Sequence, residues 1–171
     1  MKKLTMITVL LGVICSGFFA VAQPPAGTSA VPEATTYQIR NVKFGDLLRP
    51  QDANNADGTR LVLYSAQPWK CMTWDLQPAT TNAFHVRNLF TSKTFAVDDA
   101  LAVIQVPLKK DSAQTPGWQF TKLEDGHYKI TDAKSGQALT AVKGKIVAEA
   151  WTNRADQKWS LEKTDPKQLT M

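Results

Sequence analysis

Few residues in this chain have the types and spacing that catalysis needs. Its two histidines, His85 and His127, stand in segments of alternating apolar residues, where a structural hydrogen bond is the commoner role. The sequence contains no His-Glu-x-x-His, Gly-x-Ser-x-Gly or Cys-x-x-Cys motif, so nothing supports a zinc hydrolase, a serine hydrolase or a thiol redox protein. Nothing in the sequence points to a glycosidase pair of carboxylates, and the acids form no cluster of the calcium-loop type. The sequence therefore predicts a protein that is not an enzyme and that uses no metal or cofactor.

Charge argues against a nucleic-acid-binding protein, and the surroundings of the cysteine favour a structural role for it. Lys and Arg total 20 against 15 Asp and Glu, a formal net charge of +5, and the basic residues are scattered among the acids. Without a basic stripe or an arginine-rich run, the sequence does not predict nucleic-acid binding. Cys71 lies between Lys70 and Met72 in a strand-like stretch, which favours a small core residue. A reactive thiol is the alternative interpretation.

Three tryptophans mark an internal repeat that must position any site. Trp74, Trp118 and Trp159 are 44 and 41 residues apart, and each is followed by alternating apolar residues. A matching opening precedes each of them: Tyr37-Gln-Ile-Arg-Asn41, Phe84-His-Val-Arg-Asn88 and Tyr128-Lys-Ile-Thr-Asp132. A period of about 40 residues indicates one supersecondary unit used three times, because such a unit cannot bury its apolar face alone. The repeats cover about residues 37–78, 83–123 and 127–163.

The segments within each repeat have the composition of short strands. They are rich in β-branched and aromatic residues, and turn signals such as Asp57-Gly58, Asp125-Gly126 and Lys143-Gly144 separate them. No window shows the apolar period of a ten-residue helix. Short strands about ten residues apart predict an all-β barrel or sandwich. The threefold repeat favours about twelve strands, four in each repeat, around a pseudo-threefold axis.

The N-terminal residues are predicted to lie outside this domain. Residues 1–22 have a basic start, an apolar run and the small residues Ala20-Val21-Ala22, which is typical of a signal peptide cleaved after Ala22. The apolar run is too short to favour a membrane span. Residues 23–36 are rich in Pro, Ala and Thr and predict a flexible tether. We therefore expect a secreted or periplasmic protein whose folded domain covers residues 37–165.

The repeats resemble the unit of ricin-B-type lectin domains, whose fold is the β-trefoil. In that family each unit opens with a strand ending in Asn, passes through a Ser-Gly-Lys-like turn, and closes on Gln-x-Trp. Repeat three matches best with Gln157-Lys-Trp159, whereas Pro116 and Met72 stand at the glutamine position of the other repeats. The resemblance covers about residues 37–163. It implies that the three tryptophans fill the core, and that Gln157 hydrogen-bonds the backbone of the neighbouring turn.

The resemblance also implies one shallow sugar pocket for each repeat. In the family, the pocket holds an Asp after the short apolar strand, a polar residue two positions before an aromatic one, and an Asn or Asp before the closing Gln. The Asp position falls on Arg49, Ala96 and Thr140, which all depart from the pattern and argue against galactose-type binding in the familiar manner. Repeat two also has Pro107 at the aromatic position, although Asp98 lies just beyond Ala96.

Repeat three keeps most of the pocket. Glu149 and Trp151 have the polar-x-aromatic spacing, and Asp156 precedes Gln157. The resemblance implies that Trp151 stacks on a sugar ring, that Glu149, Asp156 and Thr140 take its hydroxyls, and that Gln157 orients the pocket from behind. The alternative interpretation is a partly buried Trp151 among surface carboxylates. A pocket of this kind implies weak binding, roughly −4 kcal/mol for one site.

Repeat one carries a different set of residues. Tyr64 stands at the aromatic position, Trp69 lies on a neighbouring loop, and Arg49 replaces the Asp and has the charge to pair with an acidic group. Tyr64 is therefore a further candidate for contact with carbohydrate. The region of Tyr64 and Trp69 also suits a protein partner, because exposed aromatic patches mark such surfaces.

The sequence thus predicts a secreted carbohydrate-binding module whose partner is a carbohydrate or glycoconjugate. The alternative is a protein-interaction or cell-binding subunit of a secreted complex with degenerate sugar sites. The ricin-like subunits of cytolethal distending toxins have such a role, and the three replaced Asp residues favour it. A trefoil protease inhibitor is a further alternative. It is less favoured because Cys71 would be the only cysteine left after cleavage of the signal peptide, so no intramolecular disulfide would hold a rigid reactive loop.

Overall fold

The computed structural model describes residues 32–33, 35–80, 82–109 and 114–170, so the predicted signal peptide and most of the predicted tether lie outside the described residues. Within these ranges the only helices are short 3-10 turns, and none has the length or apolar content to cross a membrane. The strands are β1 (Thr36–Asn41), β2 (Leu47–Pro50), β3 (Leu61–Tyr64), β4 (Thr73–Thr80), β5 (Ala83–Asn88), β6 (Thr94–Val97), β7 (Val103–Val106), β8 (Trp118–Lys122), β9 (Tyr128–Asp132), β10 (Ala138–Val142), β11 (Lys145–Glu149) and β12 (Lys158–Lys163). The 3-10 turns are η1 (Gln51–Ala53), η2 (Lys70–Met72), η4 (Ala155–Gln157) and η5 (Pro166–Gln168).

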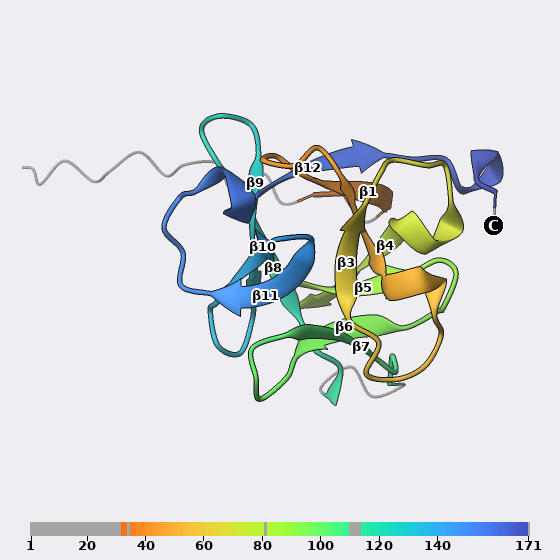
Figure 1. Ribbon diagram of the computed structural model, residues 1–171, viewed down its shortest axis with the longest axis horizontal. Coiled ribbons are helices and arrows are strands. Elements are labelled where there is room, and N and C mark those ends of the chain that lie inside the picture. Colours follow the sequence, from red (N-terminus) through yellow and green to blue (C-terminus); the bar gives the residue numbers. More distant parts are fainter. Residues whose placement is uncertain (1–31, 34, 81, 110–113, 171) are drawn as a thin grey trace, which may run out of the picture.

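Six of these strands close into a barrel. Strand β1 pairs with β4 and β12, β5 pairs with β4 and β8, and β9 pairs with β8 and β12, all antiparallel. The other six form the hairpins β2–β3, β6–β7 and β10–β11, of which β6–β7 lies at the lower edge in Figure 1. Each repeat therefore supplies two barrel strands and one hairpin. The prediction of an all-β trefoil with about twelve strands is confirmed.

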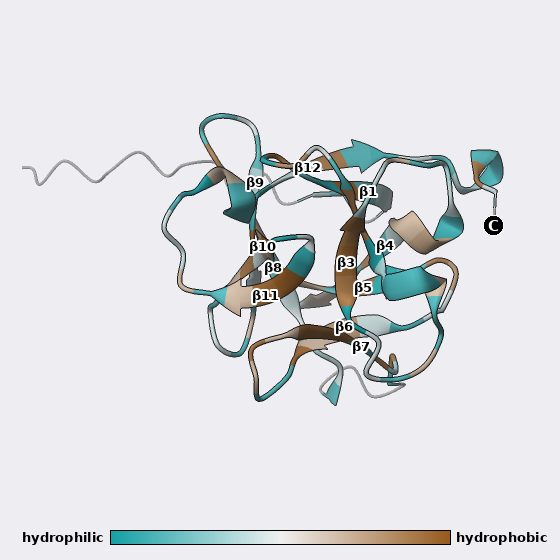
Figure 2. Cartoon of the chain, in the orientation of Figure 1, coloured by the Kyte–Doolittle hydropathy of each residue, from teal (hydrophilic) through white to brown (hydrophobic). Residues whose placement is uncertain are grey.

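The three repeat tryptophans fill the centre of the barrel. Trp74, Trp118 and Trp159 are at most 1% exposed. Their indole nitrogens donate hydrogen bonds to backbone carbonyls at equivalent places in the three hairpins: Leu48 at 3.0 Å, Phe95 at 3.0 Å and Leu139 at 2.9 Å. Strands β3 and β6 are coloured as mainly hydrophobic, whereas the end of β12 is hydrophilic (Figure 2). The tryptophans thus have the structural role expected of them, and none is available to a ligand.

Neighbouring repeats are joined by asparagine side chains at the ends of their first strands. The Asn41 carboxamide oxygen accepts from the backbone of its own turn, while its nitrogen donates to the Asp156 carbonyl at 3.0 Å. Asn88 makes the equivalent bond to the Cys71 carbonyl at 2.9 Å. Both carboxamides are buried, and each closes its own turn and ties it to a neighbouring repeat.

The domain extends slightly beyond its predicted limits at both ends. Thr36, predicted as the last residue of the tether, begins β1 and is in register with Asp75. At the other end, the backbone of Thr170 pairs with the loop before η2: its carbonyl accepts from Lys70 at 3.0 Å and its N–H donates to Pro68 at 2.8 Å. The sequence gives no signal for this pairing, because backbone hydrogen bonds form without apolar side chains and these segments are polar.

Candidate functional site

The loop that connects β11 to β12 is fixed on its buried side by hydrogen bonds to the Gln157 side chain. This side chain is fully buried; its oxygen accepts from the Thr152 N–H at 2.7 Å, and its nitrogen donates to the Ala150 carbonyl at 2.8 Å. The sequence-based expectation that Gln157 satisfies the backbone of its neighbouring turn is confirmed. Gln157 therefore positions the loop rather than contacting a ligand itself.

Thr140 is also enclosed, which corrects its expected role as a partner for sugar hydroxyls. It is 0% exposed; its hydroxyl donates to the Ala138 carbonyl at 3.0 Å and accepts from the Gln157 nitrogen at 3.2 Å. Because a side chain with this burial cannot touch a ligand, Thr140 contributes only by fixing Gln157. The position occupied by Asp in the resembled family has become part of the interior.

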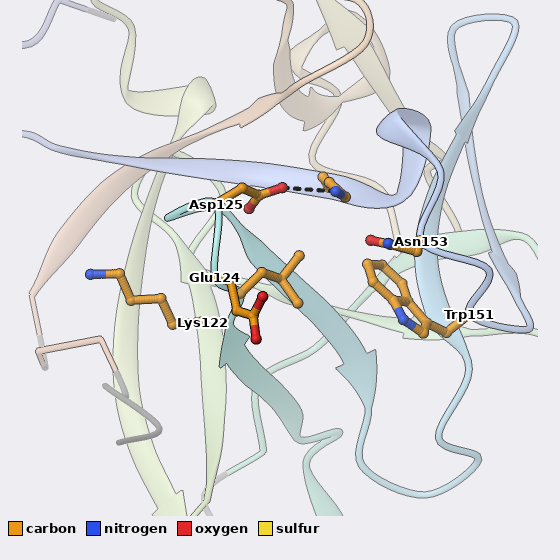
Figure 3. Close-up of a pocket in the computed structure, with 7 residues that line it drawn as sticks. Lys122, Glu124, Asp125, Trp151 and Asn153 are labelled. Carbon is orange, nitrogen blue, oxygen red and sulfur yellow. Dashed lines mark hydrogen bonds and ion pairs between the residues drawn. The ribbon is translucent and has the colours of Figure 1, made fainter. Parts of the chain in front are cut away.

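Trp151 lines a shallow pocket of about 480 Å³ between the β8–β9 turn and the loop after β11. Its ring is partly exposed, and the Lys129 ammonium lies 5.7 Å from the ring centroid. Figure 3 shows Asn153 beside the indole and Glu124 across the pocket from it, while Lys122 lies at the far side with its ammonium directed away. We call this the Trp151 pocket; its lining residues are Lys122, Leu123, Glu124, Asp125, Trp151, Asn153 and Lys158.

Asp125 is a fixed anion at the edge of the Trp151 pocket. The Lys158 ammonium donates to one of its oxygens at 2.7 Å, and the His127 backbone N–H donates to the other at 3.1 Å. The hydrogen bond from Lys158, followed by that from His127, lowers the pKa of Asp125 from 3.8 to about 2. Asp125 is therefore ionised throughout the pH range in which proteins usually work. Together the pocket offers an aromatic face, carboxylates, an amide and ammonium groups.

Glu149 and Asp156 line a different pocket, so the structure does not bring them together with Trp151. Arg154 bridges the two acids, with Nη2 at 2.7 Å from Glu149 Oε2 and Nε at 3.0 Å from Asp156 Oδ1. Lys43 holds the other Asp156 oxygen at 3.1 Å. We call this pocket of about 500 Å³ the Arg154 pocket; it is lined by Lys43, Phe44, Ala141, Val142, Lys143, Glu149, Arg154 and Asp156.

The ion pairs determine the charge state of Asp156. Burial of this carboxyl would raise its pKa, but the hydrogen bonds from Arg154 and Lys43 outweigh burial and hold the pKa below its usual range. Both oxygens are already engaged by cations. A ligand hydroxyl at this place would therefore compete with Arg154 or Lys43 for Asp156.

Several residues that line these pockets were not predicted from the sequence. Phe44 in the Arg154 pocket is 42% exposed and comes from the β1–β2 turn, far along the chain from the acids. Phe90 occupies the corresponding β5–β6 turn and is 41% exposed. An aromatic residue two or three positions after Asn41 and Asn88 is a signal that alignment of the repeats would have shown. Asp125 was assigned only to a turn, and its position beside Trp151 has no signal in the sequence.

Repeat one forms a third, smaller pocket around Arg49. Tyr64, which is 41% exposed, lies with its ring centroid 6.0 Å from that of Trp69, so the two predicted aromatics do meet. The Arg49 guanidinium carbon lies 3.8 Å from the centre of the Tyr64 ring. We call this pocket of about 240 Å³ the Arg49 pocket; its lining residues are Arg49, Ala53, Trp69, Cys71 and Phe90.

The candidate residues of repeat two serve the structure. Gln105, the polar residue two positions before Pro107, is 1% exposed and donates to the carbonyls of Asn54 and Ala56. Asp98, the acid just beyond the expected Asp position, accepts from the backbone N–H groups of Ala100 and Ala102 and closes the β6–β7 turn. Neither side chain is arranged to receive a ligand.

The remaining titratable candidates have structural surroundings. His85 is 8% exposed, with Nδ1 at 3.2 Å from the Pro116 carbonyl. Cys71 is buried as expected, and burial raises the pKa of its thiol. Across the part of the chain that the structure describes, no three His, Cys, Asp or Glu side chains gather closely enough to hold a metal ion.

Comparison with known proteins shows the fold. No family model and no curated protein sequence matches the chain. Among solved structures, a designed threefold symmetric protein, ThreeFoil, is 21% identical with a TM-score of 0.69, over 75% of this chain and 99% of its own. The C-half of the earthworm R-type lectin, in complex with GalNAc, is 14% identical with a TM-score of 0.62, over 76% of this chain and 99% of its own. A chain of the cytolethal distending toxin from Actinobacillus actinomycetemcomitans is 14% identical with a TM-score of 0.65, over 77% of this chain and 94% of its own.

Proposed function

We propose that this protein binds carbohydrate without catalysis, and that the Trp151 pocket is its principal site. The observation that carries this proposal is the partly exposed Trp151 indole beside the Asn153 amide, in a pocket whose opposite side carries the carboxylates of Glu124 and Asp125. A sugar ring needs an apolar surface for its C–H face and planar polar groups for its hydroxyls, and this pocket supplies both.

The pocket is also rigid where stacking requires it. Gln157 fixes the loop that carries Trp151 and Asn153 through two backbone hydrogen bonds. Lys158 fixes Asp125 at 2.7 Å. A preorganised site loses less conformational entropy when a ligand binds, which compensates in part for the small contact area of a shallow pocket. Affinity for a single sugar is still expected in the millimolar range, about −4 kcal/mol.

Two further considerations support this function. The structural neighbours include an R-type lectin in complex with GalNAc. The N-terminal sequence pattern predicts export, so we propose a secreted or periplasmic protein that meets glycans or polysaccharides outside the cytoplasm.

The proposal is tested by binding of the mature chain, starting at Gln23, to an array of glycans and polysaccharides. Trp151→Ala is expected to abolish binding, because it removes the stacking surface without disturbing the buried core. Phe44→Ala is the matched control, since it removes an exposed aromatic residue from the neighbouring Arg154 pocket and should leave binding intact.

The two variants separate the possible outcomes. Loss of binding in Phe44→Ala but not in Trp151→Ala would place the sugar in the Arg154 pocket, with Glu149 and Asp156, and would overturn the assignment to Trp151. Absence of binding across the whole array would overturn the carbohydrate function. Equal thermal midpoints of the wild type and both variants are required before either result is interpreted.

A second candidate function is that of a protein-interaction or cell-binding subunit. It is supported by the exposed Tyr64, whose ring lies 6.0 Å from that of Trp69. A chain of the cytolethal distending toxin has a similar fold. Tyr64→Ala would reduce binding to cells or to a co-secreted protein under this function, while Trp151→Ala would not.

A further inference from the structure

We propose that the Arg49 pocket is a second binding site, which takes a carboxylate carried on a small apolar group. This inference is independent of carbohydrate binding at Trp151, because the two pockets share no residue. It rests on the chemistry of the pocket walls, on the surroundings of the Arg49 guanidinium, and on the rigidity of the segments that form the pocket.

The walls of the pocket are apolar apart from Arg49. Trp69 and Phe90 contribute aromatic surface from the loop before η2 and from the β5–β6 turn, and Ala53 and Cys71 close the remaining sides. Burial raises the pKa of the Cys71 thiol, so its sulfur is neutral at pH 7. A volume of about 240 Å³ is below the range of about 300–1,000 Å³ typical of drug-sized ligands. The pocket therefore suits a group about the size of one ring.

Arg49 places a positive charge against these apolar walls without a close counter-ion among the described residues. The residue is 8% exposed, and its Nε is buried without a hydrogen-bond partner. The paired carboxylate, Asp52, lies 4.0 Å from Nη2, and its side chain is 80% exposed to solvent. Buried charges in proteins are normally paired and hydrogen-bonded. A ligand carboxylate would supply the close, charge-assisted hydrogen bonds that Asp52 does not.

The Tyr64 ring orients the guanidinium for such a ligand. Its centre lies 3.8 Å from the Arg49 guanidinium carbon, so the ring covers one face of the cation. Stacking of this kind leaves the N–H groups at the edge of the guanidinium, where a carboxylate binds in the plane with two parallel hydrogen bonds. An arginine held by an aromatic ring also loses less side-chain freedom when it binds an anion.

The segments around the pocket are held in place by backbone contacts. Pro68 and Lys70, which flank Trp69, form hydrogen bonds with Thr170 near the C-terminal end of the chain. On the other side, Asp52 and Ala53 both have positive φ values of 54° and 52°. Two successive non-glycine residues in this region are uncommon and are often found at ligand-binding sites. The conformation turns Ala53 toward the pocket while the Asp52 side chain remains in solvent.

The test uses phenylacetate as the probe, with phenylacetamide as its neutral counterpart of similar shape. Binding to the mature chain is followed by the NMR shift of the Trp69 indole N–H, identified with Trp69→Phe. Phenylacetate is expected to shift this signal at millimolar concentration, and phenylacetamide to bind at least about tenfold more weakly, because a hydrogen-bonded charge contributes more than a neutral group. Equal binding of the two probes, or no binding of phenylacetate, would overturn the proposal.

Variants of Arg49 provide the second part of the test. Arg49→Met keeps an apolar stem but removes the charge, and should weaken phenylacetate binding by about tenfold or more. Arg49→Lys keeps the charge without the planar fork, so it should retain part of the affinity; it also serves if Arg49→Met fails to fold. Arg60→Met, which changes an exposed arginine outside the pocket, should have no effect. Unchanged affinity in both Arg49 variants would overturn the proposal.

Two further probes identify where such a carboxylate would come from. A short peptide ending in a free phenylalanine carboxylate is compared with its amidated form, and glucuronate is tested alongside them. Discrimination between the two peptides would support a chain terminus as the source, and their equal weakness beside phenylacetate would support a free small carboxylate. Glucuronate binding more tightly than phenylacetate would overturn the requirement for an apolar group.

Discussion

Arg154 determines how the acids of repeat three are presented. Its guanidinium joins Glu149 at the end of β11 to Asp156 in η4, and Lys43 adds a second cation to Asp156. The two carboxylates that sequence spacing assigned to a sugar are thus already engaged with cations of the chain itself. At the same scale, Trp151 keeps a partly exposed ring and a pocket of its own.

The ion pairs of Asp156 make the protein sensitive to acid. The pKa of Asp156 is lower in the folded state than in the unfolded chain, where it is about 3.9. The ionised carboxylate therefore stabilises the fold fully above the unfolded pKa, and this stabilisation is lost as the pH falls through the folded pKa. We expect Asp156→Asn to lower the free energy of unfolding at pH 7 by about 1–2 kcal/mol, and to reduce the loss of stability between pH 5 and pH 3. Urea unfolding at several pH values measures both effects.

Asp99→Asn is the control for this experiment, because Asp99 is an exposed carboxylate. It should unfold with the same pH dependence as the wild type. An Asp156→Asn variant whose stability fell with pH as steeply as that of the wild type would show that Asp156 is not the acid-sensitive group.

At the scale of the element, the three repeats share one type of turn, but only two of them have a glycine at its position of positive φ. The fourth residue after Asn41, Asn88 and Asp132 donates its N–H to the carbonyl of that residue, at 2.9, 3.0 and 2.8 Å. All three have positive φ, at 75° for Gly45, 58° for Ser92 and 73° for Gly136. Repeat two therefore has a non-glycine residue in a conformation that glycine adopts without steric cost.

This difference predicts that substitutions in the equivalent turns change the stability in opposite directions. Gly136→Ser should destabilise the protein by about 1 kcal/mol, since a Cβ would meet nothing within 4 Å and only backbone strain remains. Ser92→Gly should stabilise it by up to about 1 kcal/mol, less the entropy that glycine adds to the unfolded chain. Urea unfolding of the two variants measures the pair, and a loss of stability in both would contradict the equivalence of the turns.

At the scale of the whole molecule, the barrel joins all three repeats into one cooperative unit. Strand β1 of repeat one pairs with β12 of repeat three over five residue pairs, which closes the ring. Asn88 adds a buried side-chain bond from repeat two to repeat one. No repeat has an apolar face that it can bury alone, so partial unfolding would expose the shared core.

We therefore expect a single unfolding transition. Tryptophan fluorescence reports mainly on the buried core and far-UV circular dichroism reports on the strands, so their urea midpoints should coincide. Asn88→Ala should shift both midpoints together, with a loss of about 1–3 kcal/mol, because the Cys71 carbonyl and the turn N–H groups lose their partner. Midpoints that separate in the wild type or in the variant would indicate that the repeats unfold independently.

The architecture could be predicted from sequence because it depends on a periodic signal. Trp74, Trp118 and Trp159, with the matching strand openings before them, specify a threefold unit with a shared core. The role of Gln157 could also be predicted, because its backbone partners lie within a few residues along the chain. The burial of Thr140 could not be predicted, since it depends on how the β10–β11 hairpin packs against the barrel.

The composition of the candidate pockets was decided by tertiary structure. Sequence by itself placed Trp151, Glu149 and Asp156 in one short segment, but the loop turns the indole toward Asp125 and the acids toward Lys43 and Phe44. Each pocket is completed by a turn from elsewhere in the chain, and so is the Arg49 pocket by Phe90. Local periodicity specifies which residues enter the core, because hydrophobic burial follows the strand period. Contacts between surface loops arise only when the barrel closes and brings distant turns together.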